Sequence, residues 1–201
     1  MTRAPVLGLA GILGPGLSLA VGFGLAGCVS SPATHLYALK AYPGVTAAAP
    51  PASVGARLQL RGVNLPPQFD RPEITETPDR GPLKTYPFAQ WAAPLPEMIQ
   101  ATLAADLLTR LPPGRLVESA APTPPDASLL RLDILSLHLE GGAAEAEVSW
   151  ARTPPHGGAI IIRTARIEVP ARGHGADADA QALSRLLEAI ADRMAADLAS
   201  S

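Results

Sequence analysis

The chain has 201 residues, with 16 Lys and Arg against 18 Asp and Glu, so its formal net charge is −2 at pH 7. This balance excludes the strongly basic surface of a nucleic-acid binder and leaves no polybasic patch for anionic lipid. Only one cysteine is present, Cys28, so metal sites and redox centres that need several thiols are excluded as well.

Residues 1–27 have the features of a secretory signal peptide that is removed from the mature protein. Arg3 is their only charge, and an apolar stretch from Pro5 to Gly24 follows it. The stretch is near the length of a membrane span, so a retained anchor helix is the alternative. Six glycines and two prolines within it disfavour a permanent helix, since each glycine costs about 1 kcal/mol relative to alanine.

The apolar stretch runs into Leu25-Ala26-Gly27-Cys28, which resembles the lipobox of bacterial lipoproteins. The resemblance implies signal cleavage between Gly27 and Cys28, a thioether-linked diacylglycerol on Cys28, and an N-acyl chain such as palmitate on the new amino end. No other cofactor is expected. Residues 28–34 are then a lipidated tether, which attaches the protein to a membrane without spanning it.

Val29 follows the cysteine directly. Lipoproteins of two-membrane bacteria that carry Asp at this position tend to stay in the inner membrane. The resemblance therefore implies that this protein lies on the periplasmic face of the outer membrane of a Gram-negative-type envelope. Residues 35–201 are expected to form a single domain in the periplasm, large enough for a sizeable core.

The first part of the body is predicted to contain short strands and loops. Residues 35–41 are expected to form a strand, and a Pro/Gly/Ala-rich loop follows at 42–55. In the next strand, 56–63, alternation predicts that Leu58 and Leu60 are buried, with Arg57, Gln59 and Arg61 facing solvent. Prolines interrupt the chain after it, with a short strand expected at 73–77.

A leucine stripe predicts the first helix, which begins near Leu95 and ends before Pro112. Residues recurring every four positions form the stripe, and two more widen it: Leu95, Ile99, Leu103, Leu107 and Leu111, with Met98 and Leu108. Four polar residues are expected to face away from the core: Glu97, Gln100, Asp106 and Arg110. Packing of this stripe against a sheet is the simplest interpretation.

The second half of the chain predicts four strands and a helix. After a strand at 115–119, the long strand 128–140 switches its apolar parity at Ile134–Leu135, which predicts a β-bulge. A Gly-Gly turn at 141–142 and strands 143–151 and 159–169 complete an antiparallel meander. The last helix is expected over 176–200, with Asp177 and Asp179 near its start and one apolar stripe: Leu183, Leu186, Leu187, Ile190, Met194 and Leu198.

The order strands–helix–strands–helix indicates an α+β fold. We expect a mixed, largely antiparallel sheet with two amphipathic helices packed on one of its faces. The histidines, at 35, 138, 156 and 174, show no metal-ligand spacing, so no metal site is expected, and His138 is expected at the surface. No nucleophile–base motif is recognisable, and the chain is therefore not expected to be an enzyme.

An acidic cluster in one loop is the nearest approach to a catalytic pattern. It consists of Asp70, Glu73, Glu76 and Asp79. Arg71 and Arg80 are interleaved with these acids, so a solvated loop of mixed charge is favoured over an acid–base pair.

Four sequence segments, in order, resemble the PqiC-type auxiliary lipoproteins, the ABC-type transport auxiliary lipoprotein components. They are Tyr37-Ala38-Leu39, "VNLP" at 63–66, "FDRPEI" at 69–74 and "WAAPL" at 91–95. The resemblance implies a non-enzymatic lipoprotein that docks a periplasmic MCE-domain (mammalian cell entry) protein of a lipid ABC transporter. Such systems move lipid between the inner and outer membranes and support membrane integrity. The residues singled out for partner contact or structure are Tyr37, Asp70, Arg71, Trp91, Pro94 and Leu95.

Several alternatives stay open at this stage. A free-standing periplasmic carrier lipoprotein, with an apolar cavity of its own for lipid, is the competing function. Trp91 is either a packing residue at the helix entry or an anchor in the partner interface. Association into a homo-oligomer, the lipid and the direction of transport are not fixed by the sequence.

Overall fold

The computed structural model describes residues 32–44, 56–78 and 80–199. The lipobox, with Gly27 and Cys28, and the signal peptide lie outside the described residues. Ala33–Ser201 group into one compact unit.

A five-stranded sheet forms the larger layer of this unit, in the order β5-β2-β6-β7-β8. Its strands are β2 (Leu58–Asn64), β5 (Leu116–Val117), β6 (Ser128–Glu140), β7 (Ala143–Thr153) and β8 (Ile161–Val169). β2 pairs in parallel with β5 and β6, whereas β6, β7 and β8 form the predicted antiparallel meander. The sheet is therefore mixed.

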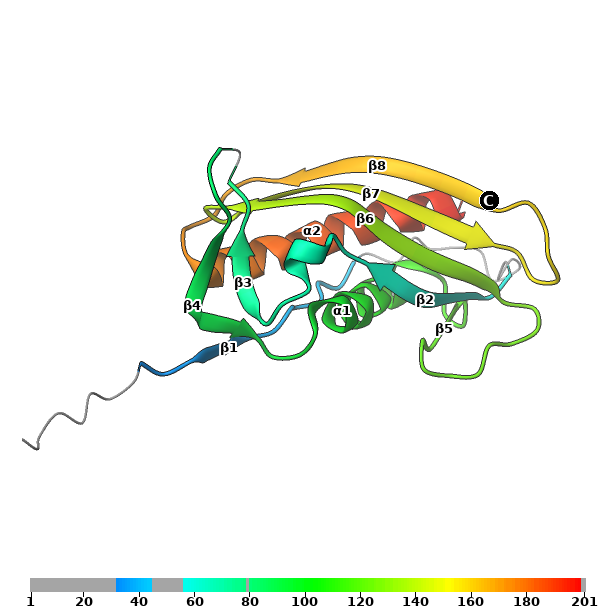
Figure 1. Ribbon diagram of the computed structural model, residues 1–201. Helices are drawn as coiled ribbons and strands as arrows, with labels where there is room; N and C mark the ends of the chain where they lie inside the picture. Colours follow the sequence, from blue (N-terminus) through cyan, green and yellow to red (C-terminus); the bar gives the residue numbers. More distant parts are fainter. Residues whose placement is uncertain (1–31, 45–55, 79, 200–201) are drawn as a thin grey trace, which may run out of the picture. The chain divides into compact units, whose positions relative to one another are not determined.

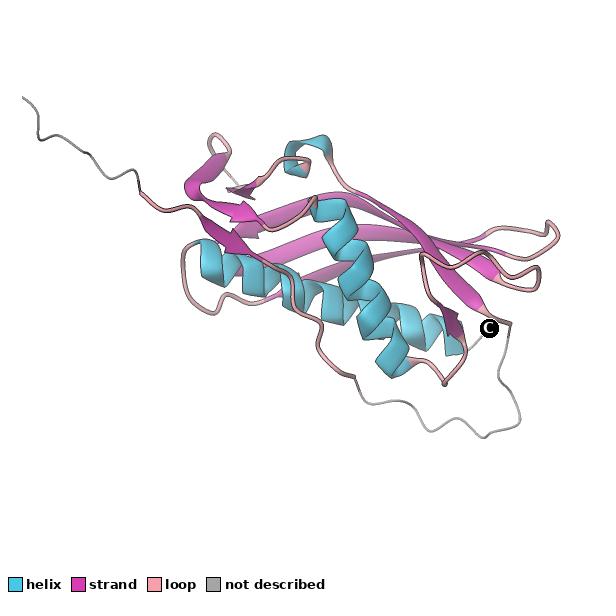
Figure 2. Cartoon of the chain, turned by 90° about the horizontal axis from the view of Figure 1, so that it is seen from below, coloured by secondary structure: helices cyan, strands magenta, loops and turns pink. Residues whose placement is uncertain are grey.

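Two helices cover one face of this sheet, α1 (Leu95–Arg110) and α2 (Ala176–Ala199). Figures 1 and 2 show them crossing on the same side of the strands. The α+β fold with two helices packed on mixed strands is thus confirmed. All six residues of the predicted α2 stripe are buried. The five residues that recur every four positions in the α1 stripe are buried as well.

The strands form two sheets, although one was expected, and the second sheet has three strands. Its order is β1-β4-β3, with β1 (His35–Tyr37), β3 (Glu73–Glu76) and β4 (Lys84–Trp91). β3 was predicted, but β4 was missed, because it contains Pro87 and shows no regular alternation. Pro87 is tolerated because it falls within a register irregularity, between the β3–β4 pairs Thr75–Thr85 and Glu73–Gln90.

The predicted bulge in β6 is confirmed. The β6–β7 register shifts between Ile134 and Ser136, and the intervening Leu135 is 54% exposed. Before the shift Leu130, Leu132 and Ile134 are buried, and after it Leu137 and Leu139 are buried. One extra residue therefore keeps a single core face along all of β6.

Gln59 was expected to face solvent, and the structure shows it fully buried. Its Nε2 donates to the carbonyl oxygens of Glu118 and Ala121, at 3.0 and 2.8 Å. Its Oε1 accepts a hydrogen bond from the Thr123 hydroxyl. The loop after β5 covers this face of β2, and full hydrogen bonding makes the burial of the amide tolerable.

The prediction of which α1 residues face solvent is also partly wrong. Asp106 is fully buried and Arg110 is 6% exposed, whereas Leu108, placed in the stripe, is 57% exposed. Arg110 lies between the helices, where it forms ion pairs with Asp106, Glu188 and Asp192. A polar pair between helices follows the same periodicity as a solvated face, so the sequence pattern did not separate the two.

The segment Lys40–Gly44, called the strap below, explains why the first strand is shorter than predicted. Alternate backbone N–H groups of the strap donate to side chains of the helices: Lys40 to Ser184 at 3.1 Å, Tyr42 to Asp106 at 2.6 Å, and Gly44 to Thr109 at 3.0 Å. These groups bind helices instead of a neighbouring strand, so strand pairing ends at Tyr37. Arg110 Nη1 also donates to the carbonyl oxygen of Tyr42 at 2.9 Å, so the strap lies against the Asp106–Arg110 pair.

Candidate functional site

A hollow of about 360 Å³ lies where the small sheet meets the start of α1. It is called the Trp91 hollow, and its lining is Asp70, Arg71, Pro72, Trp91, Ala93, Pro94 and Leu95. Five of the six residues that the resemblance singled out lie in this lining. The sixth, Tyr37, pairs with Trp91 across the β1–β4 ladder. The fold therefore gathers residues that are up to 58 positions apart in the chain.

Backbone hydrogen bonds fix Trp91 at the end of β4. Its N–H donates to the carbonyl oxygen of Pro72 at 2.7 Å, and the N–H of Ala92 donates to the carbonyl oxygen of Tyr37 at 2.8 Å. The loop before β3 is thereby held against Trp91, and β1 against Ala92. The indole is 6% exposed, so it packs in the core while still forming one wall of the hollow.

Pro94 lies immediately before α1, at the edge of the hollow. Its carbonyl oxygen accepts hydrogen bonds from the N–H groups of Glu97 and Met98, both at 3.1 Å. Leu95, the first helical residue, is 2% exposed and packs into the core. A proline immediately before the helix and a buried residue at its start fix the direction of entry.

The rim of the hollow is formed by exposed side chains. Asp70 and Arg71 follow a short 3₁₀ helix, η1 (Pro67–Phe69), and both are exposed, as is Pro94. The hollow thus offers one carboxylate and one guanidinium beside apolar proline, alanine and indole surface. An aromatic wall with two opposite charges at its rim is an arrangement that suits recognition of a partner group.

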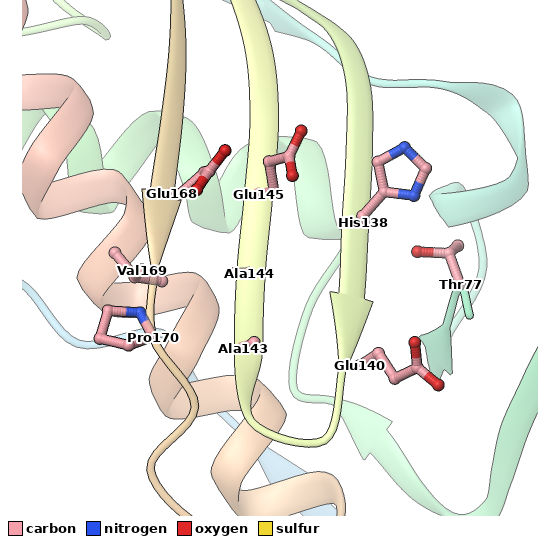
Figure 3. Close-up of a pocket in the computed structure, with 9 residues that line it drawn as sticks. All are labelled: Thr77, His138, Glu140, Ala143, Ala144, Glu145, Glu168, Val169 and Pro170. Atoms are coloured by element: carbon pink, nitrogen blue, oxygen red, sulfur yellow. The ribbon is translucent and has the colours of Figure 1, made fainter. Parts of the chain in front are cut away.

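Figure 3 shows a second hollow, of about 480 Å³, beside the β6–β7 turn. His138, Glu145 and Glu168 stand in a row across β6, β7 and β8 because His138 pairs with Glu145, and Glu145 pairs with Glu168. Arg166 forms ion pairs with both glutamates. Within the described ranges no group of three His, Cys, Asp or Glu side chains is placed to hold a metal ion. The expected surface position of His138 is confirmed.

The acidic cluster was expected to lie in a solvated loop, and for Glu76 this prediction is wrong. Glu76 is half-buried on β3, and its Oε1 lies 2.7 Å from the Tyr86 hydroxyl. The same hydroxyl lies 3.0 Å from Asp179 Oδ2, although its one proton serves only one carboxylate at a time. Burial raises the pKa of Asp179, and burial together with the bond to Glu76 raises the pKa of Tyr86. Asp79 lies outside the described residues.

These features define an α+β body with a hollow of about 360 Å³ beside its small sheet. Among the described residues, none of the helices is long and apolar enough to cross a bilayer. The model of the ABC-type transport auxiliary lipoprotein component family matches residues 37–195, and the chain belongs to that family. The expected PqiC-like family is thereby confirmed.

Solved structures show the same fold. A crystal structure described only as that of an uncharacterized protein superposes with a TM-score of 0.66 at 20% identity, covering 83% of this chain and 99% of that one. A protein from Xanthomonas campestris, assigned to the family DUF330, also gives a TM-score of 0.66, at 18% identity, covering 81% of this chain and 93% of its own. No protein of curated function matches the chain.

Proposed function

We propose that this protein is a non-enzymatic outer-membrane lipoprotein that docks the periplasmic MCE-domain protein of a lipid ABC transporter. In this role it is the outer-membrane-side subunit of a system that moves lipid between the two membranes and supports membrane integrity. Membership of a family of ABC-type transport auxiliary lipoprotein components supports the transport role. The lipobox-like sequence before Cys28 supports the anchor, and Val29 supports the outer-membrane destination.

The observation that carries the proposal is the Trp91 hollow. A docking subunit needs a fixed surface with an aromatic wall, apolar neighbours and a few charges that orient the partner. Trp91, Pro94 and the Asp70–Arg71 pair provide these groups at one place. The hydrogen bonds from Trp91 to Pro72 and from Ala92 to Tyr37 hold the hollow in shape before a partner arrives.

A free-standing lipid carrier is less well supported. The space between the large sheet and the helices is filled by side chains such as Leu60, Leu107 and Trp150, which are at most 2% exposed. Five hollows of about 230 to 640 Å³ among the described residues each include at least two charged side chains. An acyl-chain site is instead expected to be enclosed and mostly apolar.

The docking role is tested by purifying the protein from detergent-solubilised envelopes and identifying bound protein and lipid by mass spectrometry. Arg71→Glu reverses an exposed charge at the hollow and is expected to abolish co-purification of the MCE-domain protein without changing the thermal midpoint. Arg61→Glu, on an exposed position of β2, is the matched control and is expected to retain the partner.

Trp91→Ala is the second variant for the same assay. It is expected to lose the partner and to lower stability by about 3–5 kcal/mol, since a buried aromatic side chain is removed. If both Arg71→Glu and Trp91→Ala retain the MCE-domain protein, docking at the Trp91 hollow is wrong. If the unaltered protein brings down lipid but no MCE-domain protein, the carrier is favoured instead.

A further inference from the structure

β8 lies at one end of the strand order and has a strand partner on one side only. Its nine residues, Ile161–Val169, pair with Ala144–Arg152 of β7 without a register shift. Among the described residues no strand covers the opposite edge of β8. Backbone donors and acceptors along that edge are therefore available to another chain.

The devices that usually protect an edge strand are mostly missing from β8. It is longer than the common strand of about 5–6 residues, it contains no proline, and its pairing shows no bulge. Only charged side chains oppose pairing: Arg163, Arg166 and Glu168. Such charges reject an uncharged or basic strand more strongly than an acidic one.

Neighbouring hollows lie between β8 and α2. Three hollows, of about 640, 280 and 230 Å³, share lining residues: Ala189 and Asp192 belong to two of them, and Arg193 and Ala196 to two. We call the combined surface the β8–α2 groove. Small side chains line much of it, including Ala165, Ala189 and Ala196.

The inward face of β8 is correspondingly less covered than that of β7. Ala165, Ile167 and Val169 are half-buried, whereas their β7 neighbours Val148, Ala146 and Ala144 are 0–2% exposed. Helix α2 thus covers the inward face of β7 and leaves apolar surface open beside β8. Side chains of modest size on an added strand fit this space.

The charge around the groove favours an acidic occupant. Its lining contains five arginines and three acids: Arg163, Arg166, Arg172, Arg185 and Arg193, with Glu188, Asp192 and Asp197. Asp192 and Glu188 are engaged by Arg110, and Asp197 accepts hydrogen bonds from Trp150 and Arg163. Arg163 and Arg166 are ion-paired as well, with Asp197 and with Glu145 and Glu168. The positive charge available to an occupant therefore comes from Arg172, Arg185 and Arg193.

We propose that an extended, acidic segment of another protein binds the β8–α2 groove by adding a strand to β8. Main-chain hydrogen bonds along the open edge supply affinity. Alternate side chains of the segment fill the space beside Ala165 and Ala189, and its carboxylates meet the arginines. The proposal uses β8 and α2 alone, so it does not depend on the Trp91 hollow.

Two synthetic peptides test the proposal on the purified protein: a nine-residue peptide alternating valine with glutamate, and its counterpart alternating valine with lysine. The glutamate peptide is expected to bind, by fluorescence anisotropy, at least tenfold more tightly than the lysine peptide, and to weaken as salt rises. Hydrogen exchange is expected to slow at β8 amides. Equal binding of both peptides, or unchanged exchange at β8, overturns the proposal.

Two variants with matched controls locate the binding. Arg193→Glu and Ala189→Trp are expected to weaken the glutamate peptide at least fivefold, whereas Arg61→Glu and Ala101→Trp, at exposed positions outside the groove, are expected to leave it unchanged. If Ala189→Trp unfolds, Arg193→Glu decides. If hydrogen exchange at β8 slows when only the protein concentration is raised, without peptide, the edge pairs with a second copy of this chain. That result overturns the acidic-segment proposal. Trp91→Ala is expected to retain the peptide, which separates this test from that of docking.

Discussion

Asp106 shows how a single buried carboxylate links the strap to the helices. It is fully buried, its Oδ1 accepts the Tyr42 N–H, and Arg110 lies next to it on α1. Burial is the main cause that raises its pKa from 3.8 to about 6, although the Tyr42 hydrogen bond and Arg110 act in the opposite direction. The protonated form is therefore favoured in the folded protein more than in the unfolded chain.

This pKa predicts a specific pH dependence. Because the folded value exceeds the unfolded value, the stabilisation from proton binding is fully present below pH 3.8 and is lost as pH rises through about 6. As pH rises between these limits, we expect deprotonation of Asp106 to lower the free energy of unfolding by about 2–3 kcal/mol. The difference between wild type and Asp106→Asn, from urea unfolding at pH 4 to 7.5, measures this contribution. A difference that does not change with pH contradicts it.

Trp91 illustrates how far one residue could be interpreted in advance. The sequence left packing and partner contact as alternatives, and its 6% exposure supports a packing role. The same indole also lines the hollow, since burial of a large ring does not prevent one edge from facing a surface. Stability and partner binding are therefore expected to fall together in Trp91→Ala, and Arg71→Glu is needed to separate them.

At the scale of elements, Asp179 joins three parts of the fold. It lies in the first turn of α2, its Oδ1 accepts the N–H of Gly142 at 2.7 Å, and its other oxygen lies next to the Tyr86 hydroxyl of β4. The helix start, the β6–β7 turn and the small sheet thus meet at one carboxylate. The sequence had indicated only a favourable interaction with the helix dipole.

Asp179→Ala is expected to cost about 2–3 kcal/mol, because the N–H of Gly142 loses its buried acceptor. Asp177→Ala is the matched control: Asp177 lies in the same first turn but is exposed, and its loss is expected to cost less than about 1 kcal/mol. Chemical denaturation of both variants checks the difference. Equal losses indicate that only the helix dipole is involved.

The elements that were predicted well are those with a strong local pattern. The bulge at Leu135 followed from a parity switch, and the α2 stripe followed from its spacing. β4 was missed because Pro87 breaks its pattern, and Gln59 was misplaced because the loop that covers it is distant in sequence. Long-range partners decide such cases, and periodicity carries no information about them.

The candidate site was predictable only as a set of residues. The resemblance singled out Trp91, Pro94 and Asp70 with their neighbours, and the structure places them around one hollow. Their assembly depends on the parallel pairing of β1 with β4, which no local pattern indicates. The β8–α2 groove was not predicted at all, because the position of β8 at a sheet edge depends on strand order.

For the whole molecule, attachment to the membrane is the first property to test. Cys28→Ala is expected to give an unprocessed, unlipidated precursor that is absent from the outer membrane. The body is expected to fold as before, since this substitution lies outside residues 35–201. Membrane fractionation and the intact mass of the protein measure these effects. A variant with the mature mass in the outer-membrane fraction contradicts the lipoprotein assignment.

The destination within the envelope is a separate prediction. Val29→Asp is expected to hold the processed lipoprotein in the inner membrane and to impair its function with little change in stability. Density-gradient fractionation shows the distribution between the two membranes, and thermal unfolding of the purified protein provides the control. Unchanged fractionation removes the basis for the outer-membrane assignment.

The pairing of β1 with the end of β4 has a mechanical consequence for a chain anchored by its amino end. Tension carried along the tether enters the described body at His35 and is borne first by the hydrogen bonds between β1 and Ala89–Trp91. The strap then passes the load to α1 and α2 through Asp106, Thr109 and Ser184. In the proposed anchored and docked state, a partner at the Trp91 hollow is therefore held by β4, the strand that pairs with β1 next to the tether.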